Sequence, residues 1–416
     1  MLPDCGAVED AITVDEALRR IRERARPVAG SETVMLAEAC GRILAEDVIS
    51  TINLPPHDSA AMDGYAVFAA DLMPDRDTRL PVIGRAAAGH PFARAALPGE
   101  AVRVFTGAPM PRGPDTVAIQ EHCIQDGRFV RVRPGTKTGA NVRHAGEDVM
   151  AGSLAIASGQ RLGPQHLALA AAIGRTNLPL RRRLKVAVLS SGDELRQPGE
   201  TVGPGEIYDA NRFAVTGALK DLGCEVTDLG ILADDQNAVR HGLSAAAERS
   251  DLIVTSGGMS DGEEDHVKTA VRALGALSFW SLAIKPGRPV GMGRIHDVPF
   301  VGLPGNPVAA LVSFLLLVRP FALALMGASE TEPPPWRMRA GFCHAKRVGR
   351  REYLCVRIER DGPEGPVAHK LPRQGSHLLS TLSAADGLAA LEEGRAAVAA
   401  GEIIEVLPFH HGGFRP

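Results

Sequence analysis

The segment from Leu184 to about Leu325 alternates short apolar strands with helices, and this alternation restricts the folds open to the chain. Mostly apolar strands that are separated by helices are typical of a parallel sheet with both faces covered. The sequence therefore predicts an α/β domain with a doubly wound parallel sheet. The expected strands are Lys185–Ser190, Glu225–Leu229 and Leu252–Thr255, and the expected helices are Arg212–Leu222, Asn237–Arg249 and Asp265–Leu274.

The rest of the chain has a different texture and predicts further domains. With 416 residues, the chain is too long for one compact core. Short β-rich pieces alternate with Pro and Gly turns in the region 53–143, and short β segments return after the Pro333–Pro335 linker. We expect a discontinuous first domain (1–52 and 144–181), a β-rich insert (53–143), the α/β domain (182–328) and a C-terminal β domain (336–416).

Composition and charge exclude several classes of function. The chain is 45% hydrophobic and 23% charged, which is typical of a soluble globular protein. Its net charge of -3 creates no general attraction for nucleic acid or an acidic membrane, so neither is an expected partner. The apolar stretch Val308–Met326 is interrupted by Arg319 and Pro320, which predicts a buried core helix rather than a membrane span. Acidic residues near the start interrupt any signal-peptide pattern, so the expected compartment is the cytoplasm.

Three loops follow strands of the expected sheet and carry glycine and hydroxyl side chains. In an open α/β sheet, ligands bind beyond the carboxyl ends of the strands, where helix N-termini present free N–H groups. Glycine allows close approach of the backbone to a ligand, and serine adds short-range donors. One such loop is common for geometric reasons alone, but three at one edge favour a phosphate or nucleotide site. The candidate binding residues are Ser190, Gly192, Ser256, Gly257, Gly258, Ser260, Pro304, Gly305, Asn306 and Pro307.

Charged residues at the same edge indicate a cation and an anion. Each acidic residue alone is also expected as an ordinary helix cap. Several carboxylates beside a phosphate ligand suggest Mg²⁺, held by few protein oxygens and several waters. Lys285 and Arg288 stand on a stiff Pro–Gly turn that suits a compact dianion, although a solvated surface turn gives the same pattern. The acidic residues are Asp193, Glu194, Asp209, Asp234, Asp235, Glu264 and Asp265.

Blocks along almost the whole chain resemble the MoeA family of molybdopterin molybdenumtransferases. In the β-rich insert, residues 58–67 (DSAAMDGYAV) are similar to the family signature SAMDGYAV, and residues 106–109 are similar to TGAP. NVR at 141–143 with GED at 146–148 resembles another block. Further similar blocks lie at 190–195, 207–211, 256–265, 285–289, 303–307 and 374–377. The whole set in this order is far more specific than any one block.

The resemblance implies a fold and a reaction. The expected fold is α/β multidomain, with an elongated first domain, a β-rich lid, a MogA-like α/β domain and a small β-barrel-like C-terminal domain, assembled as a homodimer. The implied reaction is the Mg²⁺-dependent insertion of molybdate into adenylylated molybdopterin, which yields molybdenum cofactor and releases AMP. The adenylylating enzyme of the same pathway is a further candidate partner.

The resemblance also assigns roles to residues of this chain. The catalytic candidates are Asp63, Thr106, Glu194, Asp234 and Asp265, with Asp235 as the alternative to Asp234. The candidate molybdate contacts are Lys285, Arg288, Ser376 and Arg350. Our hypothesis is that Glu194 and Asp265 hold the metal, and that Asp63, on the lid of the other subunit, positions the pterin.

Two other functions fit parts of the sequence. The adenylyltransferase of the pathway shares the α/β domain, but the lid motif around Asp63 and the tail motif around Ser376 belong to the inserting enzyme. A scaffold role, as in gephyrin, accompanies a longer chain. The sequence leaves open whether tungstate replaces molybdate, how many metal ions bind and whether the protein is a dimer.

Overall fold

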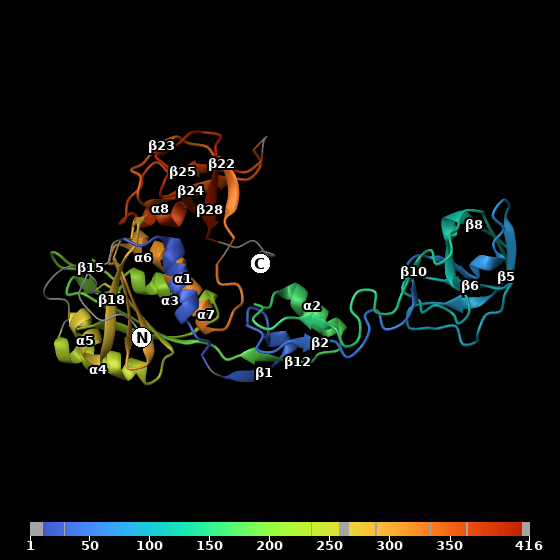
Figure 1. The fold of residues 1–416 in the computed structure, drawn as a ribbon, viewed down its shortest axis with the longest axis horizontal. Coiled ribbons are helices and arrows are strands. Elements are labelled where there is room, and N and C mark those ends of the chain that lie inside the picture. Colours follow the sequence, from blue (N-terminus) through green and yellow to red (C-terminus); the bar gives the residue numbers. More distant parts are fainter. Residues whose placement is uncertain are drawn as a thin grey trace.

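The computed structural model describes residues 11–28, 30–233, 235–257, 266–287, 289–332, 334–362 and 365–409. The molecule is long (Figure 1): the α/β domain and the C-terminal domain lie together at one end, and the β-rich insert lies at the other. A narrow middle part connects the two ends, and the chain passes through it once outward and once back. Residues on the insert are therefore far from the α/β domain of the same chain.

The α/β domain is built on a six-stranded sheet in the order β16-β13-β17-β21-β20-β18. The first four strands are parallel, whereas β20 and β18 are antiparallel to their neighbours. Two residues, His296 and Asp297, join β20 to β21, and so short a connection can only return the chain antiparallel. The predicted α/β fold with a parallel core is confirmed, and β20 and β18 extend this core as antiparallel strands on one side. The strands are β13 (Lys185–Ser191), β16 (Glu225–Leu232), β17 (Leu252–Ser256), β18 (Gly275–Ser281), β20 (Pro289–Ile295) and β21 (Val298–Leu303).

Helices cover both faces of this sheet. Successive side chains of a strand point to opposite faces, so one strand packs against helices on both sides. Val186 and Val188 of β13 share one apolar cluster with α1, α3, α6 and α7, whereas Ala187 and Leu189 share another with α4 and α5. The N-terminal helix α1 therefore packs on the α/β domain. The helices are α1 (Val14–Arg24), α3 (Asn211–Asp221), α4 (Gln236–Ala247), α5 (His266–Leu274), α6 (Pro307–Ser313) and α7 (Arg319–Leu325).

The apolar stretch before the linker forms one nearly continuous helix in this core. α6 passes into a π-helical turn (Phe314–Val318) and then into α7. Pro307–Leu325 is long and apolar enough to cross a membrane, but 72% of its apolar window lies buried inside the molecule, as expected of a core helix. The π-helical turn lies where Pro320 removes a backbone donor from the helical ladder.

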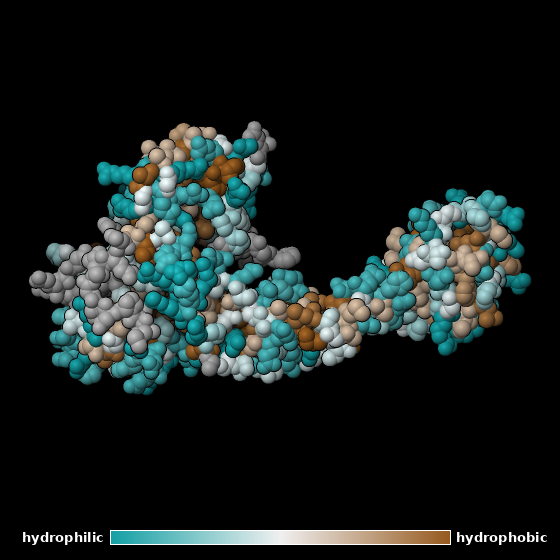
Figure 2. Space-filling model, in the orientation of Figure 1, coloured by the Kyte–Doolittle hydropathy of each residue, from teal (hydrophilic) through white to brown (hydrophobic). Residues whose placement is uncertain are grey.

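The middle part consists of short antiparallel pairs, and the insert is one mixed sheet. β1 pairs with β12 and β2 with β11, beside α2, whereas the insert has the order β7-β4-β6-β5-β9-β8. Figure 2 shows apolar surface on the middle part, where Ile49, Met150 and Leu154 are exposed. The elements are β1 (Ser31–Met35), β2 (Val48–Ile49), β3 (Ser59–Ala60), β4 (Gly64–Val67), β5 (Thr78–Ala86), β6 (Ala101–Val104), β7 (Thr116–Ile119), β8 (Cys123–Asp126), β9 (Phe129–Val132), β10 (Val142–Arg143), β11 (Leu154–Ile156), α2 (Pro164–Ala172) and β12 (Asn177–Arg181).

The C-terminal domain is a small closed barrel, which confirms the predicted β-barrel-like domain. β24, β25, β22, β28 and β26 pair in that order, and an additional pairing of β24 with β26 closes the ring. β19, from the α/β domain, adds to β24 in parallel and places Lys285 opposite Glu352. The remaining elements are β14 (Leu195–Arg196), β15 (Ile207–Tyr208), β19 (Ile284–Lys285), β22 (Trp336–Ala340), β23 (His344–Ala345), β24 (Arg351–Glu359), β25 (Val367–Lys370), α8 (Leu379–Ala384), β26 (Gly387–Leu391), β27 (Ala397–Val398) and β28 (Ile403–Pro408).

Candidate functional site

The carboxyl ends of the parallel strands lie in register at one edge of the sheet. Ser190 of β13 is opposite Ser256 of β17, and Ser256 is opposite Leu303 of β21. Because β20 runs antiparallel to β21, its start at Pro289 lies at the same end. The three loops that follow β13, β17 and β21 therefore open on the same side of the domain as the turn that begins at Lys285.

Two of these loops are in backbone contact, and a third is tied to them by a side chain. Gly257 has a φ of 83°, and a Cβ at this position would lie 2.6 Å from the carbonyl oxygen of Ser191. Asn211 Nδ2 donates to Ser256 Oγ at 2.9 Å and to the carbonyl oxygen of Gly305 at 2.7 Å. Asn211 is not among the site residues predicted from the sequence, although its place at the start of a helix beside this edge is a usable signal.

The predicted binding residues differ in their access to a ligand. Ser190 is fully buried, and its hydroxyl has no hydrogen-bond partner among the described residues. Pro304 is buried, whereas Gly305 and Asn306 are exposed and Pro307 is half-buried at the start of α6. The predicted residues that lie outside the described ranges are Asp234, Gly258, Ser260, Glu264, Asp265 and Arg288.

The acidic residues at this edge have different environments. Glu194 is exposed, and its carboxylate lies so close to Gly192 that a Cβ there would be 2.5 Å from Oε2. Asp209 is 2% exposed and accepts a hydrogen bond from Arg212 Nε at 2.8 Å, which makes it part of a buried ion pair. Asp235 caps α4 by accepting from two backbone amides. Asp209 and Asp235 therefore have structural roles, and Glu194 remains available to a ligand.

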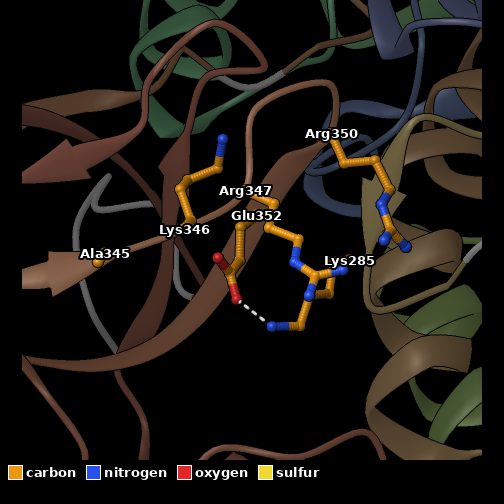
Figure 3. Close-up of a pocket in the computed structure, with 6 residues that line it drawn as sticks. All are labelled: Lys285, Ala345, Lys346, Arg347, Arg350 and Glu352. Atoms are coloured by element: carbon orange, nitrogen blue, oxygen red, sulfur yellow. Dashed lines mark hydrogen bonds and ion pairs between the residues drawn. The ribbon is translucent and has the colours of Figure 1, made fainter.

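A basic pocket of about 490 Å³ lies where the Lys285 turn meets the barrel (Figure 3). Its lining residues are Lys285, Ala345, Lys346, Arg347, Arg350 and Glu352. The structure thus brings Lys285 and Arg350, both predicted as molybdate contacts, into one pocket. Ser376 is not among the lining residues, and its carbonyl oxygen accepts a hydrogen bond from the amide of Val308 at 2.9 Å.

Glu352 is the acidic member of this pocket, and it holds Lys285. Lys285 Nζ lies 2.7 Å from Glu352 Oε1, and His344 Nε2 lies 3.2 Å from Oε2. Burial alone would raise the pKa of this carboxyl, but the hydrogen bonds from Lys285 and His344 outweigh burial and hold the pKa below its usual range. The side chain of Lys285, which is 63% exposed, is thereby fixed at the pocket.

Three charged lining residues, Glu352, Lys346 and Arg347, were not predicted from the sequence. The signal for Lys346 and Arg347 is the run 346–351, in which four of six residues are Lys or Arg, and Glu352 directly follows it. A run of charges is usually a solvated surface, and the sequence has no local feature that places this one against Lys285.

On the insert, Asp63 and Thr106 form one cluster. Asp63 Oδ1 accepts hydrogen bonds from the amide and the hydroxyl of Thr106, both at 2.8 Å. These two bonds, with a smaller contribution from the charge of Arg103, lower the pKa of Asp63. The insert lies at the end of the molecule opposite the α/β domain (Figure 1). The structure therefore brings Asp63 to Thr106 but not to the Lys285 pocket of the same chain.

Three family models together match most of the chain. Family models match at residues 12–174 (MoeA N-terminal region, domain I and II), 187–324 (probable molybdopterin binding domain) and 337–409 (MoeA C-terminal region, domain IV). The chain is 39% identical over 402 residues to a molybdopterin molybdenumtransferase of Haemophilus influenzae, covering 96% of this chain and 99% of that protein. It is 36% identical over 408 residues to molybdopterin molybdenumtransferase 2 of Mycobacterium tuberculosis, covering 94% and 99%.

Solved structures agree with these matches. A molybdopterin biosynthesis MoeA protein from Pyrococcus horikoshii aligns with a TM-score of 0.82 and 27% identity, covering 96% of this chain and 100% of that one. A second structure of a MoeA protein from that source aligns with a TM-score of 0.75 and 32% identity, covering 97% and 100%. Since sequence and fold both match over nearly the full length, the chain belongs to the MoeA family.

Proposed function

We propose that this protein is a molybdopterin molybdenumtransferase, an enzyme that inserts molybdenum, supplied as molybdate, into molybdopterin. Relatives that match over 96% and 94% of the chain have that name, and the family model that matches its α/β region is described as a probable molybdopterin binding domain. The observation that carries the proposal is the sheet register. This register puts the Gly257 loop, the Pro304 loop and the Lys285 turn at one edge, next to a basic pocket.

The basic pocket is the proposed molybdate site. Molybdate is a tetrahedral dianion, and the pocket is lined by four basic side chains and one carboxylate. Lys285 is held in place by Glu352, so at least one cation is fixed before the oxyanion arrives. The contribution of the protein is positioning, since the oxyanion must lie where the dithiolene sulfurs of the pterin can replace its oxo ligands.

The finer form of the proposal has adenylylated molybdopterin as the substrate, AMP as the second product and Mg²⁺ as the cofactor. Mg²⁺ is usually held by one or two carboxylates together with substrate phosphates and water. The exposed carboxylate of Glu194 fits that donor set, and Asp265 is the second expected ligand. In such a site the substrate's own phosphates and water would supply the remaining donors. Mg²⁺ bound there would neutralise phosphate charge during cleavage of the pyrophosphate link.

A second subunit completes the proposed site. Asp63 and Thr106 are on the insert, at the end of the molecule opposite the Lys285 pocket. They can therefore reach such a pocket only if it belongs to another copy of the chain. Exposed apolar side chains on the middle part support an interface there. Asp63 Oδ1 is bound to Thr106, and within the described part of the chain Oδ2 has no partner, which leaves an acceptor for pterin N–H groups.

A reconstituted reaction tests the function. The purified protein is incubated with adenylylated molybdopterin, Mg²⁺ and molybdate, and both AMP and molybdenum cofactor are measured, with tungstate and oxyanion-free reactions in parallel. We expect cofactor only when an oxyanion is present, and we expect Lys285→Ala to raise the molybdate KM about tenfold. Folded protein that forms no cofactor would reject the proposal. AMP release that ignores the oxyanion would favour a nucleotide-handling enzyme instead.

A further inference from the structure

The four basic side chains of the pocket differ in the partners that they already have. The ammonium of Lys346 donates to the carbonyl oxygens of Glu392 at 2.7 Å and of Arg395 at 2.8 Å, and Figure 3 shows it turned away from Lys285. Lys285 is paired with Glu352, so the charges of these two groups largely offset each other. The N–H donors of the Lys346 ammonium are thus used by backbone carbonyl oxygens, and the charge of Lys285 is largely offset by that of Glu352.

Arg347 and Arg350 are the remaining two basic residues of the pocket. Both are exposed, and within the described part of the chain neither makes a hydrogen bond or an ion pair. Their side chains extend toward the part of the pocket that holds Lys285 (Figure 3). Two uncompensated guanidinium charges at one cavity repel each other, and an anion between them would remove that repulsion.

The segment that bears both arginines is held by backbone hydrogen bonds to the neighbouring segment that contains Glu393 and Ala396. The amide of Lys346 donates to the carbonyl oxygen of Ala396 at 2.8 Å, and the amide of Gly349 donates to that of Glu393 at 2.9 Å. The ammonium of Lys346 adds its own bonds to the same neighbouring segment. Because the backbone is fixed, binding a ligand has to order only the two arginine side chains and not the segment that bears them.

We propose that Arg347 binds the oxyanion directly and forms, with Arg350, a guanidinium pair for a tetrahedral dianion. Each guanidinium has a planar set of donors that matches two oxygens of an oxyanion, and two such charges balance one dianion. Lys285, partly neutralised by Glu352, then serves to orient the anion toward the sheet edge. This inference rests on the proposed function, because it adds a contact to the pocket proposed for molybdate.

Binding of molybdate alone to the full-length protein, measured by isothermal titration calorimetry at constant ionic strength, tests the proposal. Wild type is compared with Arg347→Ala, Arg350→Ala and the control Arg360→Ala, which removes an equal charge from an exposed residue just after the far end of β24. We expect Arg347→Ala and Arg350→Ala each to weaken binding about tenfold, and Arg360→Ala to bind like wild type. Arg347→Lys should recover part of the loss, because it restores the charge without the planar donor set.

Thermal unfolding separates binding from folding. Arg347→Ala should keep the wild-type Tm, whereas Lys346→Met should lower it because carbonyl oxygens lose their donor. Wild-type affinity in Arg347→Ala, with Arg350→Ala weakened, would overturn the role of Arg347 and leave the molybdate pocket standing. If wild type itself does not bind molybdate, the pocket proposal fails, and the role of Arg347 fails with it.

Discussion

Asp209 and Glu194 lie at the same edge of the sheet, yet only Glu194 is available to a ligand. Asp209 is buried against Arg212, and Arg212 also pairs with Asp228 of the neighbouring strand β16. The sequence alone could not separate the two carboxylates, because a buried ion pair is recognised only when burial and both partners are known. Glu352 shows the reverse case, since it is a buried acid that serves the site by holding a cation.

Glu352→Gln tests that role through pH. The pKa of Glu352 lies below its ordinary value of 4.5, so its stabilising contribution is present above pH 4.5 and is lost as the pH falls through the lower, folded-state pKa. We expect Glu352→Gln to lower the free energy of unfolding by about 1–2 kcal/mol at pH 7, and we expect this difference to shrink below pH 4.5. Urea unfolding of wild type and Glu352→Gln at pH 7, 5 and 3.5 measures this difference in the free energy of unfolding.

A matched control lies on the same strand. Glu359 is exposed and lies 2.7 Å from His369, so Glu359→Gln should change stability by less than about 0.5 kcal/mol at pH 7. If Glu352→Gln lowers the free energy of unfolding equally at every pH, the shape of the Glu352 side chain and not its charge makes it stabilising.

Among the secondary-structure elements, several helices and strands of the α/β domain have nearly the bounds that the local sequence predicts. The expected helix Arg212–Leu222 is α3 at Asn211–Asp221, and the expected strand Leu252–Thr255 is β17 at Leu252–Ser256. The antiparallel pair β20–β21 was missed. These strands contain glycines and two prolines, and they are joined through His296, which adopts a φ of 51° without a glycine in the turn.

The loop after β17 gives a prediction about backbone geometry. Gly257 has a φ of 83°, and a Cβ there would lie 2.6 Å from Ser191 O, so Gly257→Ala should cost about 2 kcal/mol or more in unfolding free energy. Gly305→Ala is the control, because nothing lies within 4 Å of a Cβ at that position. Thermal unfolding compares the two variants, and similar Tm values would argue against the close contact between the loops.

For the whole molecule, the decisive feature is the distance between the insert and the Lys285 pocket of the same chain (Figure 1). Asp63 and Lys285 cannot act together unless two chains assemble. Because a dimer with two-fold symmetry has two equivalent sites, each site would combine the pocket of one subunit with the insert of the other.

Mixed dimers test this arrangement. One subunit has Asp63→Ala, the other has Lys285→Ala, and different tags allow the mixed dimer to be purified. We expect about half of the wild-type rate per dimer, since one of its two sites keeps both residues. Pairing wild type with a chain that has both substitutions is the control. With molybdate well below its wild-type KM, this control should have little activity if the sites are shared, whereas sites within single chains would reverse the two results.

The sequence by itself determined the alternation of the α/β core, the loops at its edge and the family-like blocks, because apolar periodicity and turn residues act over short stretches of chain. Only the tertiary structure decided which charges meet. Lys285 and Glu352 are separated by 67 positions and come together only because β19 pairs with β24. Strand pairing between domains and the burial of ionic partners depend on long-range packing, so the basic pocket and the separation of Asp63 from it could not be deduced from local pattern.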